Sequence, residues 1–430
     1  DSSRCTFDAF DLSRDLMRGI RAIGFETPRP IQAETIPAGL EGRDVLGLAQ
    51  TGTGKTAAFG LPILQRLIDE PGPGPLALIL APSRELATQI DAELRSLARH
   101  TRIASVTVFG GVSARAQISA LRRRPEIVVG CPGRVLDLLQ QGHLKLDEVE
   151  TLVLDEADHM FDMGFLPDVR RIMNACPKDR QNLLFSATMP REIRKLADDL
   201  LHDPHVAELA RSSPADTIDH ALYPVPEIQK RELLERFLNE DDCTSAIVFT
   251  RTKHRTRRLA EQLAKAGHRA VGLQGNMSQG QRDRAMGGFR SGRYDVMVAT
   301  DIAARGIDVS GISHVINFDV PNTPEAYTHR IGRTGRSGVE GRACTFVTRE
   351  DGAWVRDTER MIGSPIQVRK VEGFDEVAFD RNGPRRKQGN SGNRPGSRQN
   401  GRPRQGQGQG RGSGSGRRSG GGGRRSGARR

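Results

Sequence analysis

The chain has 430 residues, which is enough for two or three domains with a core in each. No apolar run approaches the roughly twenty residues of a membrane span, and the first residues, which begin without Met, lack a signal-peptide pattern, so we expect no membrane partner. Five cysteines without paired spacing indicate neither a metal site nor a disulfide framework, and they favour a reduced, cytoplasmic compartment.

The formal charge of +12 belongs to the C-terminal tail. Residues 381–430 contain fifteen Lys and Arg and no acidic residue, whereas residues 1–380 carry fifty basic and fifty-three acidic groups. Arginines separated by Gly and Ser can bind phosphates without a fixed shape, so we expect a disordered tail that binds polyanions. A tail that only promotes solubility or condensation is the alternative.

The elements, in chain order, predict two α/β units. A strand at 44–48 leads into a helix at 57–68, and further strands are expected at 76–81, 104–109, 127–130, 151–154, 182–186 and 206–209, with helices such as 84–99 and 114–123 between them. A polar break at 211–216 predicts a linker. Strands are then expected at 220–225, 246–250, 270–273, 295–299, 314–318 and 343–347, with helices that include 228–238 and 253–266. This alternation predicts mostly parallel sheets covered on both faces, with ligands at the carboxyl ends of the strands.

The segment between the first strand and its helix has the composition of a phosphate-binding loop: Ala49, Gln50, Thr51, Gly52, Thr53, Gly54, Lys55 and Thr56. The two glycines allow backbone N–H groups to turn inward, and the helix N-terminus favours anions. Lys55 would reach the β- and γ-phosphates of a nucleoside triphosphate, and the Thr56 hydroxyl would bind Mg²⁺. The alternative is a Gly/Thr-rich turn, which the flanking strand and helix disfavour.

An acidic segment, residues 155–158, directly follows the strand at 151–154. A carboxylate at a strand end can hold Mg²⁺ while its neighbour orients the attacking water, so we assign Asp155 to the metal and Glu156 to the water as general base. Acidic runs are usually solvated loops. Here the preceding apolar strand and the phosphate loop favour the catalytic interpretation.

These four residues read Asp-Glu-Ala-Asp, and residues 5 to 365 resemble, in motif order, the DEAD-box ATP-dependent RNA helicases of superfamily 2. Residues 158–165 are most similar to the bacterial RhlE-like subgroup. The resemblance implies two RecA-like parallel-sheet domains, 1–212 and 213–370, joined by a short linker and followed by a disordered Gly/Arg-rich tail, 371–430. It also implies ATP and Mg²⁺ as cofactors and RNA, structured or duplex and with little sequence preference, as partner.

The resemblance further assigns residues to ligands. Residues 24–32 resemble the adenine-reading Q motif, in which Gln32 pairs with the base edge and Phe25 stacks on it, with Phe7 upstream. The family usually has Thr or Ser where this chain has Arg29, which removes a hydroxyl expected to steady the phosphate loop. The implied RNA contacts are Pro82, Ser83, Arg84, Gly110, Gly111, Arg134, Thr250, Arg251, Arg282 and Thr300. Cys131 stands where the family usually has Thr.

Other motifs imply coupling and catalysis. The hydroxyls of Ser186 and Thr188 are expected to bond the carboxylate of Asp158 and to link hydrolysis to strand separation, with a helix N-cap at Thr188 as the alternative. Asp308 is expected to accept a hydrogen bond from the ATP ribose, and Arg305 to couple the two sites. The implied catalytic residues near the C-terminal end of the second unit are His329, Arg333 and Arg336. Guanidinium groups there could neutralise charge on the γ-phosphate, although an arginine cluster is more often a solvated face.

The sequence therefore predicts an RNA-stimulated ATPase that opens short RNA duplexes and remodels RNA–protein complexes. ATP and RNA together would close the two domains, because each would bind residues of both. An ATP-gated RNA clamp and an RNA chaperone whose tail anneals strands remain as alternatives, and a DNA helicase is a weaker one. Protein partners would come from an RNA-processing, ribosome-assembly or decay complex.

Overall fold

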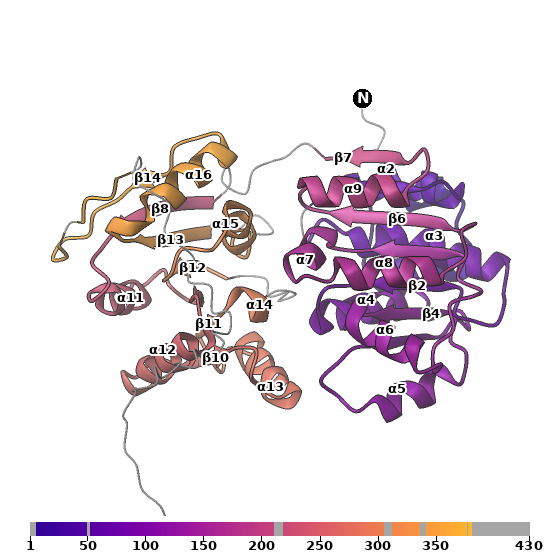
Figure 1. The fold of residues 1–430 in the computed structure, drawn as a ribbon, viewed down its shortest axis with the longest axis horizontal. Coiled ribbons are helices and arrows are strands. Elements are labelled where there is room, and N and C mark those ends of the chain that lie inside the picture. Colours follow the sequence, from indigo (N-terminus) through magenta and orange to yellow (C-terminus); the bar gives the residue numbers. More distant parts are fainter. Residues whose placement is uncertain are drawn as a thin grey trace, which may run out of the picture. The chain divides into compact units, whose positions relative to one another are not determined.

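The computed structural model describes residues 6–49, 52–209, 218–304, 312–335, 341–375 and 377–380. These residues form two seven-stranded parallel sheets, each with helices around it (Figure 1). Within these ranges, no helix combines the length and the apolar character needed to cross a membrane. The predicted linker at 211–216 lies outside the described residues, and so do residues 376 and 381–430 of the predicted tail, 371–430.

The first sheet has the strand order β3-β4-β2-β5-β6-β1-β7. Its strands are β1 (Val45–Leu48), β2 (Ala77–Leu80), β3 (Ser105–Val108), β4 (Ile127–Gly130), β5 (Thr151–Leu154), β6 (Gln181–Ser186) and β7 (His205–Glu208). The associated helices are α1 (Arg14–Ala22), α2 (Pro30–Leu40), α3 (Lys55–Asp69), α4 (Arg84–Leu97), α5 (Ala114–Leu121), α6 (Pro132–Gln140), α7 (Ala157–Asp162), α8 (Leu166–Ala175) and α9 (Arg191–Leu200), after a short 3₁₀ helix η1 (Phe7–Phe10).

The second sheet has the strand order β10-β11-β9-β12-β13-β8-β14. Its strands are β8 (Ile218–Pro224), β9 (Ala246–Phe249), β10 (Ala270–Leu273), β11 (Val296–Ala299), β12 (His314–Asn317), β13 (Gly341–Val347) and β14 (Gln367–Val368). Its helices are α11 (Lys230–Leu238), α12 (Lys253–Lys265), α13 (Gln279–Arg290), α14 (Asp301–Ala304), α15 (Pro324–Ile331), the 3₁₀ turn η2 (Arg349–Asp351) and α16 (Gly352–Ile362).

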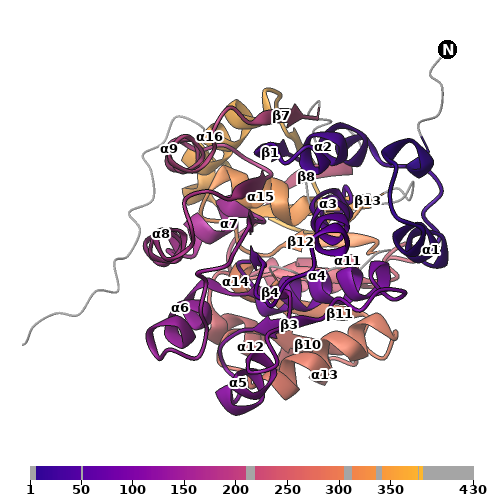
Figure 2. The same ribbon diagram turned by 90° about the vertical axis from the view of Figure 1, so that its right-hand side faces the viewer.

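The central strands are buried along their whole length, because each sheet has an apolar core on both of its faces. Figure 2 shows the first sheet with α6 and α8 on one side and α3 on the other. In β2, Ala77 and Ile79 belong to one apolar core, and Leu78 and Leu80 belong to the core on the other face. This double burial explains why the strands read as continuous apolar runs rather than as alternating ones. The strands predicted in both units are confirmed, whereas the short edge strand β14 was not predicted.

The strand order determines which loops meet at the carboxyl edge of the first sheet. β6 lies between β1 and β5, so the segments that follow these three strands are neighbours. The phosphate loop follows β1, the acidic segment follows β5, and the Ser-Ala-Thr segment, residues 186–188, begins at the end of β6. In the second sheet, Val371 and Phe374 pack against one core, so apolar contacts continue beyond residue 371.

Candidate functional site

The phosphate loop ends at the N-terminus of α3, which begins at Lys55, slightly before the predicted start. Gly54 precedes the helix with φ 91°, and Gly52 has φ 88°. A Cβ on Gly54 would lie 2.5 Å from the side-chain nitrogen of Gln32, so this position requires glycine both for its backbone conformation and for space. The predicted loop residues Gln50 and Thr51 lie outside the described residues.

The Q-motif residues contact the phosphate loop directly. Gln32, which is 1% exposed, donates from Nε2 to the Gly54 carbonyl at 3.0 Å and accepts from the Arg29 backbone N–H at 2.8 Å. Arg29 donates from Nη1 to the Gly52 carbonyl at 2.5 Å. The hydroxyl usual in the family is absent at this position, but the Arg29 guanidinium contacts the loop from there.

The aromatic residues of this region form a stack. The rings of Phe7 and Phe25 lie 6.2 Å apart with 19° between their planes. Phe7 is 2% exposed, whereas Phe25 is half-buried, so Phe7 supports one face of Phe25 rather than presenting its own surface to a ligand. The adenine contacts assigned to Phe25 and Gln32 stay predictions.

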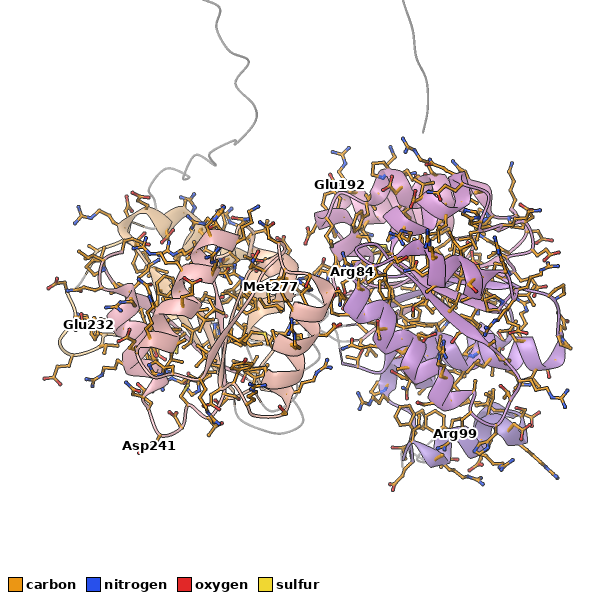
Figure 3. The ribbon with its side chains drawn as sticks, turned by 90° about the horizontal axis from the view of Figure 1, so that it is seen from below. Arg84, Arg99, Glu192, Glu232, Asp241 and Met277 are labelled. Carbon is orange, nitrogen blue, oxygen red and sulfur yellow. The ribbon has the colours of Figure 1, made fainter. Side chains whose placement is uncertain are left out.

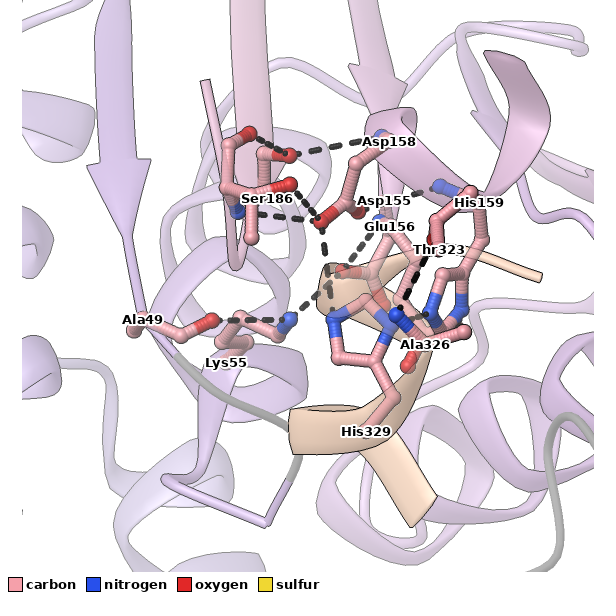
Figure 4. A network of polar contacts seen from close by, with 11 residues as sticks. Ala49, Lys55, Asp155, Glu156, Asp158, His159, Ser186, Thr323, Ala326 and His329 are labelled. Carbon is pink, nitrogen blue, oxygen red and sulfur yellow. Dashed lines mark hydrogen bonds and ion pairs between the residues drawn. The ribbon is translucent and has the colours of Figure 1, made fainter. Parts of the chain in front are cut away.

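Lys55 points from the loop toward the acidic segment (Figure 4). Its Nζ donates to the Ala49 carbonyl at 3.2 Å and lies 3.6 Å from Asp155 Oδ1. Burial tends to lower the pKa of this ammonium, but the charges of Asp155, Glu156 and Asp158 raise the pKa above its ordinary value. Lys55 is therefore charged, as a phosphate-binding lysine must be.

The two carboxylates at the end of β5 are both buried, Asp155 at 2% and Glu156 at 3% exposure. Burial raises the pKa of Asp155 to about 6, with Lys55 opposing this rise and Glu156 adding to it. Burial also acts against ionisation of Glu156, but His159, Lys55 and Arg333 together hold its pKa below the ordinary value. Glu156 has a left-handed backbone, φ 54°, which is uncommon for a side chain of this size and is typical of functional sites.

Asp158 links the acidic segment to the loop after β6. Its Oδ2 accepts from the Thr188 hydroxyl at 2.8 Å and from the Thr188 backbone N–H at 2.9 Å. The expectation that two hydroxyls bond this carboxylate was wrong for Ser186, whose hydroxyl accepts from the Asp158 backbone N–H at 3.3 Å and donates to the Thr188 carbonyl at 2.7 Å. Thr188 is also not the helix cap, since Pro190 precedes α9.

Histidines from the two sheets meet beside these carboxylates (Figure 4). His159 Nδ1 lies 2.8 Å from Glu156 Oε2, and its Nε2 lies 2.9 Å from Nδ1 of His329 on α15. His329 Nε2 lies 3.9 Å from Asp158 Oδ2. Sequence reasoning assigned a role to His329 but not to His159, and a histidine directly after a catalytic acidic segment was the available signal.

The arginines after α15 differ in their roles. Arg330 is buried and makes a bidentate pair with Asp301 at 2.5 and 2.8 Å, and it also donates to Asn317 at 3.0 Å, so it joins α15 to α14 and β12. Arg333 is 6% exposed and lies near enough to Glu156 to lower its pKa. The predicted site residues Arg336, Arg305 and Asp308 lie outside the described residues.

Two of the predicted RNA-binding arginines contact residues of the other sheet. Arg84 (Figure 3) donates from Nη1 to Gln279 Oε1 at 2.8 Å and packs over Gly111. Arg282 donates to Glu85 Oε1 from two nitrogens, at 3.0 and 2.7 Å. Sequence reasoning did not single out Glu85 or Gln279, although both lie inside motifs that it used.

The remaining predicted RNA-binding residues have varied surroundings. Arg134 donates to the Val112 carbonyl at 3.4 Å, and Ser83 caps α4 by accepting from a backbone N–H at 3.1 Å. Thr250 is fully buried and shares its hydroxyl with Thr256 at 2.6 Å, so its side chain does not support an RNA contact. The backbone N–H of Arg251 donates to Asp319 Oδ2 at 2.8 Å. Of the other predicted RNA-binding residues, Pro82 is buried, Gly110 has no side chain, and Thr300, which precedes α14, is half-buried.

A separate cluster of Glu240, Asp242 and His314 lies at the opposite, amino edge of the second sheet. Arg342 donates to Glu240 at 2.5 Å and lies 3.7 Å from Asp242. The guanidinium already neutralises these carboxylates, so the cluster is a structural ion-pair network.

Comparisons with known proteins agree with this geometry. Residues 29–196 match the DEAD/DEAH box helicase family, and residues 229–338 match the helicase conserved C-terminal domain. The ATP-dependent RNA helicase CshA of Listeria monocytogenes is 45% identical over 372 residues, which cover 86% of this chain and 71% of that protein. The structure of Saccharomyces cerevisiae Dbp5 bound to RNA and ADP BeF3 has a TM-score of 0.75 at 34% identity, covering 85% of this chain and 95% of that one. Mss116p bound to ssRNA and AMP-PNP has a TM-score of 0.78 at 30% identity, covering 86% and 80%.

Proposed function

Because this chain belongs to the DEAD-box ATP-dependent RNA helicases, which hydrolyse ATP, we propose how its own residues couple hydrolysis to RNA. Its two parallel-sheet units are RecA-like domains, as expected. In our proposal, RNA-stimulated hydrolysis opens short RNA duplexes and remodels RNA–protein complexes. The basic tail adds RNA binding without sequence preference.

One observation carries this proposal, namely the convergence of residues of both sheets on the acidic segment after β5. His329 lies 2.9 Å from His159, and Arg333 lowers the pKa of Glu156. A site that draws on both domains is complete only when they are together. Any ligand that binds both domains therefore favours the complete site, and we propose that RNA stimulates hydrolysis in this way.

We assign the triphosphate to the loop before α3. The backbone N–H groups at this helix N-terminus and the charged Lys55 would bind its phosphates. The Thr56 hydroxyl and the Asp155 carboxylate are hard oxygen donors of the kind that Mg²⁺ prefers, so the residues present fit that ion. Mg²⁺ would supply charge neutralisation at the phosphates.

We assign the proton-accepting step to Glu156. Its depressed pKa keeps it ionised at neutral pH, so it can accept a hydrogen bond from the attacking water and orient it. It would take the proton as the water attacks the phosphorus. Arg333 would stabilise the charge that develops on the γ-phosphoryl group, as arginine fingers do. Asp158 would pass the state of this site to the loop of Thr188 through the two hydrogen bonds they share.

Finer assignments are also proposals. We place the chain in the RhlE-like subgroup, in the cytoplasm, with protein partners from RNA processing, ribosome assembly or decay. The similar bacterial helicase CshA is compatible with this placement. Its domains would be 1–212 and a second one from 213 that continues past the predicted end at 370, because Val371 and Phe374 pack on its core, with the tail after it. The adenine and ribose contacts predicted from the motifs belong to the same proposal, as do the predicted RNA contacts other than that of the buried Thr250 side chain.

The deciding experiment compares ATP hydrolysis with single-stranded RNA, structured RNA and single-stranded DNA. We expect strong stimulation by both RNAs and little by DNA, because the predicted contacts include 2′-hydroxyls. Lys55→Ala should lower turnover by at least about 10²-fold, since it removes a charge aimed at the phosphates. The exposed Lys145→Ala serves as the control. Equal hydrolysis with and without RNA would refute the proposal.

Duplex opening and strand annealing are measured on the same protein with and without residues 381–430. Loss of annealing together with unchanged ATP turnover would favour the chaperone alternative. ATP-dependent RNA retention without duplex opening would favour the clamp.

A further inference from the structure

His159 is a buried histidine between the proposed general base and the second sheet. Its side chain is 3% exposed, and both of its ring nitrogens have a partner. Nδ1 lies 2.8 Å from Glu156 Oε2, and Nε2 lies 2.9 Å from His329 Nδ1. The centroids of the two imidazole rings are 4.4 Å apart, and the rings are nearly perpendicular, at 86°. Figure 4 shows the two rings next to each other.

Hydrogen-bonding chemistry gives this chain of groups a direction. An ionised carboxylate only accepts, so Nδ1 of His159 carries the proton and donates to Glu156. If the His159 ring is neutral, its Nε2 accepts from the Nδ1–H of His329; if the ring is protonated, Nε2 donates to His329 Nδ1. In both cases His329 links to His159 through Nδ1, and its buried Nε2 has no hydrogen-bond partner and lies 3.9 Å from the Asp158 carboxylate. Burial, together with the nearby His159 and Arg333, lowers the pKa of His329 to about 3, which agrees with a neutral ring.

The two contacts have different origins. The bond between His159 and Glu156 lies within the first domain, between the residue that precedes α7 and the first turn of that helix. The bond between His159 and His329 depends on a residue of the second domain. A ring held at one nitrogen can still rotate about its side-chain bonds, whereas a ring held at both nitrogens cannot rotate without breaking a bond.

We propose that His159 is a positioning residue that orients the Glu156 carboxylate when His329 arrives from the second domain. This inference rests on the proposed function, in particular on Glu156 as the general base. Through His159, the orientation of the Glu156 carboxylate would depend on domain closure. His159 would thereby contribute to the RNA dependence of hydrolysis. His159 itself touches neither water nor nucleotide in this proposal.

The test separates turnover from binding. His159→Phe keeps the ring volume and removes both hydrogen bonds. We expect the RNA-stimulated kcat to fall by about 10²-fold, the loss that follows a misplacement of about 1 Å in a catalytic group. The KM for ATP should change by less than about threefold, and RNA affinity with a non-hydrolysable ATP analogue by less than about tenfold, the value of one hydrogen bond. The exposed His143→Phe is the matched control.

Two conservative variants address folding and chemistry. His159→Asn keeps a donor near the Nδ1 position but is too short to contact His329. Its RNA-stimulated kcat should therefore fall less than that of His159→Phe. It also decides the question if the phenylalanine variant fails to fold, which thermal unfolding would reveal. His329→Asn keeps the donor that His159 needs, so it should retain a higher kcat than His329→Phe.

The double variant His159→Phe/His329→Phe tests whether the two histidines act through one contact. In that case it should be no slower than the slower single variant, whereas independent roles would multiply the losses. Three results would each overturn the inference: losses of kcat that multiply in the double variant, a His159→Phe kcat within about threefold of the parent, or a loss explained wholly by weaker RNA binding.

The proposed function and this inference fail in different ways. Normal turnover by Lys55→Ala would refute the function itself. If Lys55→Ala and Glu156→Gln are inactive but His159→Phe has normal ATP turnover, only the positioning role of His159 is refuted.

Discussion

Replacement of Gly111 by alanine should displace Arg84 without removing it. Gly111 has φ 75°, and an alanine Cβ there would come 2.5 Å from the Arg84 guanidinium carbon and closer still to its two terminal nitrogens. The end of an arginine side chain moves more easily than backbone, so the guanidinium has to leave and its 2.8 Å bond to Gln279 is lost. If Arg84 binds an RNA phosphate as proposed, the same movement removes that contact.

The change has two effects of different size. The left-handed backbone costs an alanine about 1–2 kcal/mol of folding free energy. The lost charge-assisted bond to phosphate is worth about 1.5–3 kcal/mol, which corresponds to about a 10- to 100-fold loss of RNA affinity. The slope of log affinity against log salt should also become shallower by about 0.7 for a single strand. The loss of affinity is measured on folded protein, so the folding cost does not enter it.

The assay is fluorescence anisotropy of a labelled single-stranded RNA with a non-hydrolysable ATP analogue, at several salt concentrations. Gly142→Ala is the matched control, because Gly142 has φ 72° and its Cβ would meet no atom within 4 Å. It carries the same backbone cost without touching Arg84. The reasoning is refuted if Gly111→Ala binds RNA as tightly as Gly142→Ala, or if it weakens binding further in an Arg84→Ala background.

Three more predictions concern the nucleotide site and the thiols. Arg333→Ala should lower the RNA-stimulated kcat by about 10³-fold or more and leave ATP affinity nearly unchanged, since a finger acts on transition-state charge; unchanged turnover would remove Arg333 from the mechanism. Thr188→Val keeps the backbone bond to Asp158 and loses the hydroxyl bond of 2.8 Å, so duplex opening should fall about tenfold relative to ATP turnover; equal losses in both assays would contradict the coupling role. Burial raises the pKa of Cys176 to about 11 and that of Cys131, Cys243 and Cys344 to about 12. At pH 8 about 0.1% or less of these thiols is ionised, so mass spectrometry should show slow alkylation of each until the protein unfolds or the pH rises well above 9; fast labelling of the native protein at pH 8 would be the contrary result.

Features that depend on neighbouring residues in the chain were predictable. The strands of both sheets follow from short apolar runs, since burial on both faces leaves no polar alternation. The phosphate loop and the acidic segment follow from their places directly after β1 and β5. Edge strand β14 was missed because two exposed residues carry no burial signal.

Side-chain partners were the features that sequence reasoning could not supply. Arg29 and Gly52 stand 23 residues apart and meet only because α2 packs on α3. The direction of the Ser186 hydroxyl depends on the backbone path after β6, which placed a peptide N–H and a carbonyl within its reach. The Ser186 expectation failed, and the Arg29 contact was not predicted, because a hydrogen bond depends on local geometry to within tenths of an ångström, which residue identity does not specify.

The sequence by itself determined the two α/β units and the chemical groups at the strand ends, because periodicity and motif order are local properties of the chain. Only the tertiary structure decided that His159 joins Glu156 to His329, across a separation of 170 residues. The reason is physical: the partner of a buried ring nitrogen is set by the packing of elements that are distant in sequence.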